Sequence, residues 1–282
     1  MPDDSRQDRI RRAAPLAIVA LLAQAHGAAA ADAPAAEPNA APTVSFSADV
    51  ELSTAYVFRG LNVFGDRQSD AHGLVAPSFL LGFPGPALTV GFWTGWQWSG
   101  DNTAHKLHAG AGGEVDLCLT WDTAFLDDSL ALAATLLWYF YPAATEEDAG
   151  AAMPSYLEPT VLLTWSGAVD LSFKTLYSAG VQDALDYYRY LYFRPSVSRT
   201  VDIGAAGSMS FELGVGYKLF HGHPAADGSN VWDVQLDWRW AIPLTDAVYL
   251  QPAFHVAWTN LGGVAFADEL VYWAGANLGF GL

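Results

Sequence analysis

Apolar and polar residues alternate over long stretches of this chain, beginning with VSFSADVELSTAYVFR at residues 44–59. In this stretch Phe46 and Val50 share one parity, and Asp49 and Glu51 share the other. Such a period of two predicts a β-strand with one apolar and one polar face. Runs of this kind recur about every 20 residues, which is typical of consecutive antiparallel hairpins. We count runs at 44–59, 74–83, 87–98, 113–122, 129–141, 156–165, 168–178, 188–198, 208–220, 230–242, 247–259 and 269–282.

The alternation alone fits two architectures. In a soluble sandwich the apolar row faces a core, whereas in a transmembrane barrel it faces lipid and the polar row faces the interior. The apolar rows of the clearest runs contain no charged residue, which favours lipid exposure because a Lys or Arg at mid-bilayer costs about 2–4 kcal/mol. These rows are Leu88, Val90, Phe92, Thr94, Trp96 and Trp98; Val115, Leu117, Leu119 and Trp121; Met209, Phe211, Leu213, Val215, Tyr217 and Leu219; Trp232, Val234, Leu236, Trp238, Trp240 and Ile242; and Val248, Leu250, Pro252, Phe254, Val256 and Trp258.

Two further patterns favour the barrel. Tryptophans gather near the ends of runs, where a barrel places its interfacial girdles, as at Trp98, Trp121, Trp138, Trp165, Trp232, Trp240 and Trp258. The connections also alternate in length. Short ones occur at 83–87, 166–168 and 243–247, and long polar ones at 60–73, 99–110, 142–155 and 221–229. Short turns at one end and long loops at the other are the asymmetry of outer-membrane barrels.

We therefore predict an all-β protein in the bacterial outer membrane, a closed antiparallel transmembrane β-barrel of about 12 strands that spans residues 44–282. Val44 to Phe58 would then face lipid, and Asp49, Glu51 and Arg59 would face the lumen. Four prolines lie inside runs, namely Pro77, Pro159, Pro195 and Pro252. Because a closed barrel has no edge strand to tolerate a missing hydrogen bond, we expect bulges or strand ends at these prolines.

The N-terminus predicts export. Arg9, Arg11 and Arg12 precede an apolar run at 13–25 that ends in small residues, so residues 1–30 are expected to be a cleaved signal peptide. Residues 31–43 form an Ala/Pro-rich lead-in. The single cysteine, Cys118, excludes an intramolecular disulfide and lies too far from the cleavage region for a lipoprotein anchor.

The chain is strongly acidic, with 13 Lys+Arg against 30 Asp+Glu and a net charge of −17. This balance argues against a nucleic-acid partner, which requires a basic face. The expected partners are outer-membrane lipid and lipopolysaccharide, small solutes or cations, and the barrel-assembly machinery. We expect no cofactor and no metal site, since His105, His108, His221 and His223 lie in long connections at a spacing that gives little support for a ligand set.

The polar rows supply the candidate functional residues. Twelve strands close to a radius of roughly 12 Å, which leaves a narrow lumen suited to ions or small solutes. We expect the lumen to be lined by Asp49, Glu51, Arg59, Glu114, Asp116, Asp170, Lys174, Glu212, Lys218, Asp233, Asp237, Arg239 and His255. Acids outnumber bases in this set, so the hypothesis is a porin-like, cation-leaning diffusion channel. The alternative is that these charges pair across the lumen and plug it.

Three other interpretations stay open. Tyr190 and Tyr192 could stack solutes on a lumen wall, but the interfacial girdle is the favoured interpretation of DYYRYLYFR at 186–194. A phospholipase-like enzyme would need an outward-facing histidine near a strand end, whereas the parity of His255 is inward. A non-conducting adhesion or structural barrel would work through its long loops.

The segment STAYVFRGLNVFG at 53–65 resembles the first-strand signature of the TorF-type porin family of proteobacteria. In that family a Ser, an aromatic residue and Phe-Arg-Gly follow the signal peptide, and Ser53, Tyr56, Phe58, Arg59 and Gly60 stand in those places here. The stretch VGFWTGWQWSG at 90–100 is similar to the Gly- and Trp-containing second hairpin of the family. The resemblance covers residues 44–100 and implies an outer-membrane channel.

Overall fold

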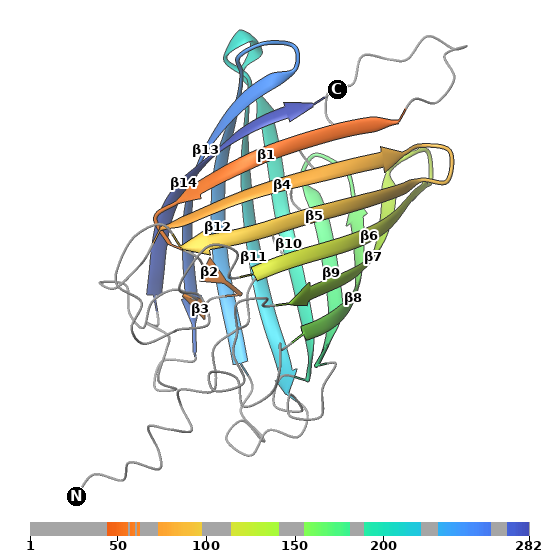
Figure 1. Ribbon diagram of the computed structural model, residues 1–282, viewed down its shortest axis with the longest axis vertical. Coiled ribbons are helices and arrows are strands. Elements are labelled where there is room, and N and C mark those ends of the chain that lie inside the picture. The colour runs from red at the N-terminus through yellow and green to blue at the C-terminus, as the bar shows by residue number, and fades with distance from the viewer. Residues whose placement is uncertain are drawn as a thin grey trace, which may run out of the picture.

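In a computed structural model of the protein, twelve strands form one closed barrel (Figure 1). The structure describes residues 44–55, 57–59, 61–62, 73–97, 114–140, 155–180, 189–220, 231–260 and 270–281. The barrel strands are β1 (Ser45–Ser53), β4 (Leu74–Phe83), β5 (Leu88–Gln97), β6 (Glu114–Phe125), β7 (Leu130–Phe140), β8 (Ser155–Trp165), β9 (Asp170–Gly180), β10 (Tyr190–Asp202), β11 (Ser208–Phe220), β12 (Val231–Pro243), β13 (Val248–Thr259) and β14 (Leu270–Gly281). A hairpin of two short strands, β2 (Val57–Phe58) and β3 (Leu61–Asn62), stands apart from the ring.

Each barrel strand pairs antiparallel with its neighbours in the chain, and β1 closes the ring by pairing with both β4 and β14. Ser47 lies opposite Gly281, so the barrel begins and ends at the same rim. Closure gives every barrel strand a hydrogen-bonded neighbour on both sides and leaves no open sheet edge, which a barrel in hydrocarbon requires. In the described part of the chain, no helix combines the length and apolar character needed to span a bilayer.

The barrel strands confirm most of the runs that the alternation predicts. Eleven of the twelve runs coincide with strands to within a few residues at each end. The first run is wrong at its end, because β1 stops at Ser53 rather than continuing to Arg59. The Ser53 hydroxyl donates to the carbonyl oxygen of Ala55 at 2.8 Å, and this local turn directs the chain off the barrel wall. The predicted signal peptide and lead-in lie outside the described residues.

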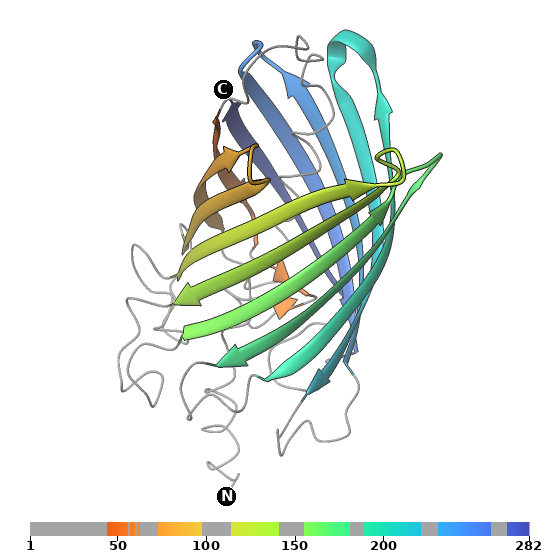
Figure 2. The same ribbon diagram turned by 90° about the vertical axis from the view of Figure 1, so that its right-hand side faces the viewer.

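Five short turns join the hairpins at the rim that carries the start of β1, which we call the turn end (Figure 2). They are residues 84–87, 126–129, 166–169, 203–207 and 244–247. The three short connections predicted from the sequence are therefore confirmed. The long connections at 60–73, 99–110, 142–155 and 221–229 lie almost wholly outside the described residues.

The four strand prolines occupy neither bulges nor strand ends, so that expectation is wrong. At Pro195 the ladder between β10 and β11 skips two residue pairs, between Phe193 opposite Tyr217 and Ser196 opposite Gly214, and then resumes in the same register. The ladder between β10 and β9, on the other side of Pro195, is intact and places Pro195 opposite Phe173. Comparable gaps occur in one ladder beside Pro77, Pro159 and Pro252. The barrel therefore accommodates each missing N–H by a local gap on one side of the proline.

The exterior of the described barrel is an apolar belt. Leu119, Leu136, Leu213, Leu236 and Phe254 are each between 44% and 49% exposed although they lie in mid-strand. Arg199, near the turn end of β10, is the one charged residue in the outward rows of the described strands. The predicted orientation is thus confirmed, with the oily rows on the outside of a closed barrel. The fold is that of a bacterial outer-membrane β-barrel, and the outer membrane is where a barrel with this exterior resides.

Exposed tryptophans lie near strand ends, as the girdle interpretation predicts. Trp121, Trp165, Trp232 and Trp258 are 40–56% exposed. Trp240 donates its indole N–H to the carbonyl oxygen of Ala206 at 2.8 Å, close to the turn end. Trp98 lies outside the described residues. Indole rings at this level combine an apolar face with a polar N–H, which suits the boundary between hydrocarbon and headgroups.

The turn at 203–207 contains a glycine that the backbone requires. Gly207 has φ +96°, and a Cβ there would collide with the carbonyl group of Ala241. We expect Gly207→Ala to destabilise the barrel by about 2 kcal/mol or more, because backbone atoms cannot move aside. Gly204→Ala is the matched control, since Gly204 has φ +66° but open space around it and should cost about 1 kcal/mol. Urea titration in phospholipid vesicles, followed by tryptophan fluorescence, measures both; equal losses would contradict the steric argument.

Candidate functional site: the charged barrel interior

The inward-facing rows of the described strands carry the charges of the barrel. Their burial changes along the barrel axis. On β12, Asp233 and Asp237 are almost inaccessible, whereas Arg239, nearer the turn end, is partly exposed. On β6, Glu114 and Asp116 are likewise inaccessible, and burial decreases towards the turn end. The interior is therefore filled in the half opposite the turn end and more open in the half beside it.

The residues expected to line the lumen separate along this gradient. Asp49, Glu51, Asp170, Glu212, Arg239 and His255 are partly exposed, and Glu114, Asp116, Lys174, Lys218, Asp233 and Asp237 are buried. All twelve stand on the inward rows of barrel strands. Arg59 is the exception, because it lies in the turn between β2 and β3 rather than on the wall of the barrel.

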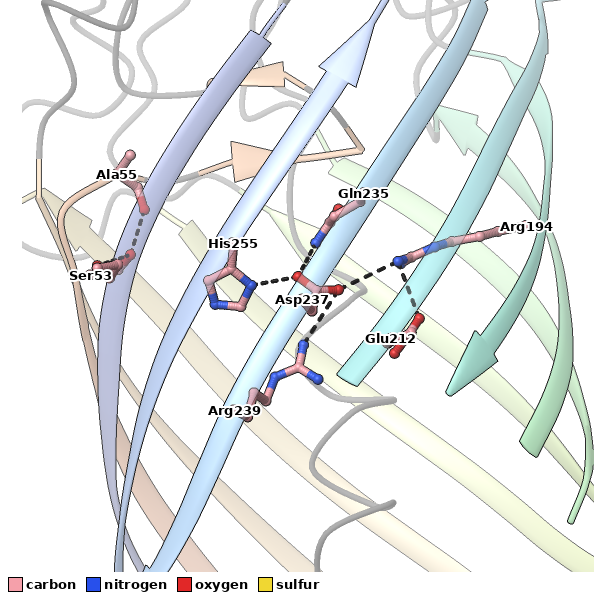
Figure 3. A network of polar contacts seen from close by, with 9 residues as sticks. Ser53, Ala55, Arg194, Glu212, Gln235, Asp237, Arg239 and His255 are labelled. Carbon is pink, nitrogen blue, oxygen red and sulfur yellow. Dashed lines mark hydrogen bonds and ion pairs between the residues drawn. The ribbon is translucent and has the colours of Figure 1, made fainter. Parts of the chain in front are cut away.

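Asp237 is the centre of a network that links three strands (Figure 3). Its Oδ1 atom accepts a hydrogen bond from Gln235 Nε2 at 2.8 Å and contacts His255 Nδ1 at 2.5 Å. Its Oδ2 atom lies 3.6 Å from the guanidinium of Arg194 and 3.7 Å from that of Arg239. A buried carboxylate is stable only with such compensation, so two cations and two hydrogen-bonding partners surround this one group.

Glycines on β11 make room for the network. Arg194 on β10 reaches Asp237 on β12 by crossing over β11, where a Cβ on Gly214 would meet its guanidinium group. The same guanidinium lies 3.2 Å from Glu212 Oε1. Glu212 and Asp237 stand directly opposite each other in the ladder, so Arg194 also offsets the repulsion between these two carboxylates.

A second cluster lies in the buried half, around Arg59. Its guanidinium donates two hydrogen bonds to Glu158 on β8, at 2.6 Å and 3.1 Å, and a third to the Tyr190 hydroxyl. It also lies 4.8 Å from the centroid of the Tyr192 ring, within cation–π range. Lys218 on β11 donates to the backbone carbonyl oxygen of Arg59 at 2.9 Å. Three strands therefore hold one arginine that belongs to none of them.

The charges are segregated around the ring. Strands β9–β12 form one wall of the barrel. Within the described residues, every Lys and Arg except Arg59 lies on or next to these strands, and Arg59 contacts them. The arc from β13 through β1 to β7 contains no Lys or Arg in its described residues, yet it carries Asp49 and Glu51 on β1 and Glu114 and Asp116 on β6. Asp116 is completely buried, and neither of its carboxylate oxygens has a hydrogen-bond partner. One wall is therefore balanced by ion pairs and the other is acidic.

Residues 35–265 match the family model described as a bacterial protein of unknown function, Gcw_chp. The chain belongs to this family. No curated protein matches this Gcw_chp member in sequence. The resemblance of residues 53–65 to the TorF-type porins stays a prediction.

Solved structures share the fold of this Gcw_chp chain. The COG4313 outer membrane channel from Pseudomonas putida F1 is 14% identical with a TM-score of 0.53, and the match covers 89% of this chain and 99% of that one. The NanC porin is 12% identical with a TM-score of 0.50, over 82% of this chain and 97% of that one. At such low identity these likenesses support the barrel fold of the Gcw_chp chain and no particular solute.

The structure corrects the girdle interpretation of DYYRYLYFR. Tyr190 and Tyr192 are at most 2% exposed and face the interior of the Gcw_chp barrel, where they contact Arg59 and Asp233. Their parity with Arg194 carries this information, because three polar residues separated by Leu191 and Phe193 mark one inward row. An inward tyrosine can place its ring in a crowded interior and still hydrogen-bond through its hydroxyl.

Sequence reasoning also missed two interior charges, Glu158 and Arg194. Both stand on inward rows. On β8, Leu157 and Pro159 face the exterior, and Glu158 between them faces the interior. The alternation in run 156–165 was sufficient to find Glu158 as an inward carboxylate. The identity of its partner was not accessible in this way, since Arg59 lies 99 residues away in the chain.

The histidine predictions divide between described and undescribed residues. His105, His108, His221 and His223 lie outside the described residues. His255 faces inward as its parity predicts, and its ring stacks on Trp273 at a centroid distance of 4.8 Å. Among the residues that the structure describes, no group of three His, Cys, Asp or Glu side chains could hold a metal ion. Cys118 is buried on β6, in keeping with a structural role.

Proposed function

We propose that this protein is a porin-like channel for passive diffusion of ions or small solutes across the outer membrane, with a preference for cations. The observation that carries the proposal is the inverted barrel, whose exterior is apolar and whose interior rows bear charges along their length. A barrel that served only as a membrane anchor would have no need of so many interior charges, each of which must be compensated. The fold shared with an outer membrane channel and a porin supports the same function.

The lining of this channel is the set of inward-facing charges described above. They are Asp49, Glu51, Arg59, Glu114, Asp116, Asp170, Lys174, Glu212, Lys218, Asp233, Asp237, Arg239 and His255, together with Glu158 and Arg194. Outer-membrane lipid and lipopolysaccharide surround the barrel, and the barrel-assembly machinery inserts it.

The preference for cations follows from which acids are neutralised. Glu158 on β8 pairs with Arg59, and Asp237 on β12 lies within 4 Å of Arg194 and Arg239. Asp233 on β12 accepts a hydrogen bond from the Tyr192 hydroxyl. In the described structure Asp49 and Glu51 have no ion pair, are partly exposed to the interior, and stand on the arc whose described residues include no Lys or Arg. Asp116 on the same arc is fully buried and does not meet mobile ions. Carboxylates that keep their negative charge in a narrow pore raise the local concentration of cations.

Planar-bilayer recording tests this function directly. We expect the refolded protein to give stepwise currents, with a reversal potential in a KCl gradient whose sign indicates cation preference. Absence of current steps under conditions in which the protein is folded and inserted would contradict the channel, and an anion-selective reversal potential would contradict the assignment of the acidic arc.

Neutralising the acidic arc should remove the cation preference. We expect the double variant Asp49→Asn, Glu51→Gln to move the reversal potential to within a few millivolts of zero, because it removes the partly exposed carboxylates of the arc that has no described Lys or Arg. Arg199→Gln is the matched control, since it changes one charge on the exterior of β10 and should leave the reversal potential unchanged. A double variant as selective as the parent would show that other acids carry the selectivity.

One observation favours a second candidate, a non-conducting barrel. The interior half opposite the turn end is almost inaccessible, and Arg59 with its partners fills part of it. A permanently filled interior would leave the long loops as the functional part. Liposome swelling distinguishes the two candidates, because a channel admits small sugars and a filled barrel does not.

A further inference from the structure

The segment that follows β1 enters the interior of the barrel. β1 ends at Ser53, and the chain then forms the β2–β3 hairpin, in which Val57 pairs with Asn62 and Phe58 with Leu61. In the ring, β9 stands six strands from β1 in either direction. Arg59, in the turn of the hairpin, contacts β8, β10 and β11, which surround this opposite position. The chain therefore crosses the barrel interior from one wall to the other, and we call residues 57–59 and 61–62 the crossing segment.

The near end of the crossing segment rests on β13 and β14. Ala55 is buried in a small apolar cluster with Ala257, Val271 and Trp273, and Val57 packs against the same cluster. The Thr54 amide donates to the carbonyl oxygen of Ala274 at 2.8 Å. This contact fixes the point at which the chain leaves the barrel wall.

The far end is held mainly by one side chain. Arg59 has φ +48°, a left-handed conformation that costs energy for a residue with a side chain, so its contacts must compensate for it. The bidentate contact with Glu158 is the most directional of these, and the pair is almost completely buried. Removing either partner takes from the other its bidentate, oppositely charged partner in the interior. Since the described hairpin has only two residue pairs of its own, its position depends on this anchor.

We propose that the crossing segment is the constriction that sets the size limit of the channel, and that Glu158 is the positioning residue that holds it across the pore. This inference rests on the proposed channel function. The crossing segment lies in the half of the barrel where the inward rows are least accessible, which is where a size filter would act. Releasing Arg59 from Glu158 frees the segment to move aside and widens the path.

Single-channel recording of four variants tests the constriction. We expect Glu158→Gln and Arg59→Ala each to raise the conductance at least about two-fold and to add gating noise, because the anchor is lost while the barrel wall is kept. In the charge-reversed variant, Arg59→Glu with Glu158→Arg, the ion pair is restored and the conductance should return towards the parent value. Arg199→Ala is the control, since it removes one exterior cation from the same wall and should not alter the conductance. Conductances equal to the parent value in both single variants would overturn the constriction and leave the channel proposal intact.

A labelling experiment tests the contact between Arg59 and Glu158 without a conductance measurement. Val57→Cys, in a background where Cys118 is replaced by alanine, places one thiol on the crossing segment. We expect adding Glu158→Gln to raise its rate of reaction with a water-soluble maleimide by about ten-fold, because loss of the far-end anchor lets the segment move away from the cluster on which Val57 is partly buried. An unchanged rate would overturn the anchoring role of Glu158. If no variant conducts but the rate rises, the channel function fails while the anchor stands.

Discussion

Replacing Asp237 by alanine is expected to destabilise the barrel by about 3–5 kcal/mol, the cost of breaking a buried ion pair by removal of one partner. Asp237 is almost fully buried and lies within 4 Å of both Arg194 and Arg239. Without it the two cations stay in the interior with one compensating charge fewer, and His255 and Gln235 lose their hydrogen-bonding partner. The loss therefore arises from what remains behind more than from the contact that is removed.

The measurement is equilibrium unfolding by urea in phospholipid vesicles. Asp170→Ala is the matched control, since Asp170 is partly exposed and accepts a hydrogen bond from the amide of Gly167, which lies in a turn, at 3.2 Å. It should cost about 1 kcal/mol or less. A double-mutant cycle with Arg194→Ala should give a coupling energy of about 1–3 kcal/mol. A loss below 1 kcal/mol for Asp237→Ala would show that water reaches this cluster and solvates the arginines.

The barrel wall could be predicted from the sequence because lipid imposes one simple rule on every strand. Each outward residue must be apolar, and the alternation along a strand reports this rule one residue at a time. Leu117 and Leu119 on β6 followed it, as did Phe211 and Leu213 on β11. Even the prolines leave the register unchanged, so the pattern continues across Pro195 without a shift.

The interior could be predicted only in part, because alternation gives the face of a residue and not its partner. Glu158 and Arg59 are distant in the chain, and their contact depends on where β1 ends. The alternation of residues 54–58 is compatible with a longer strand, and the local turn at Ser53 overrides it. Tyr190 and Tyr192 were misassigned for a related reason, since tyrosine suits both an interface and a crowded polar interior.

The arrangement of interior acids and bases says more about ion selectivity than their total number does. An excess of interior acids predicts a cation preference wherever those acids stand. In the structure, however, Glu212 and Asp237 share Arg194, and Glu158 is paired with Arg59. The two walls differ in whether their carboxylates are paired with cations, and this pairing depends on contacts between strands such as β10 and β12. A charge count from sequence cannot separate carboxylates that attract mobile cations from those that bind fixed ones.

Because outward rows face lipid and inward rows face the interior, the same substitution should have different costs at two adjacent residues of one strand. Leu136 and Thr135 lie near the middle of β7; Leu136 is 47% exposed on the barrel exterior, and Thr135 faces inward, where its hydroxyl is 2.9 Å from that of Thr120. We expect Leu136→Arg to destabilise the barrel by about 2–4 kcal/mol, because it places a cation in hydrocarbon at mid-bilayer. Thr135→Arg adds the same charge on the acidic side of the interior and should cost about 1 kcal/mol, mainly the lost hydrogen bond.

Unfolding in vesicles of known hydrocarbon thickness separates these outcomes, since both variants carry the same side chain on the same strand. The difference between them isolates the face, because strand propensity and added charge cancel. A larger loss for Thr135→Arg than for Leu136→Arg would mean that the charged rows, rather than the oily ones, are excluded from water. In that case the barrel interior would be a dry core, and neither the channel nor its constriction could exist. A penalty confined to Leu136→Arg would instead require the interior to be hydrated enough to accept one more cation.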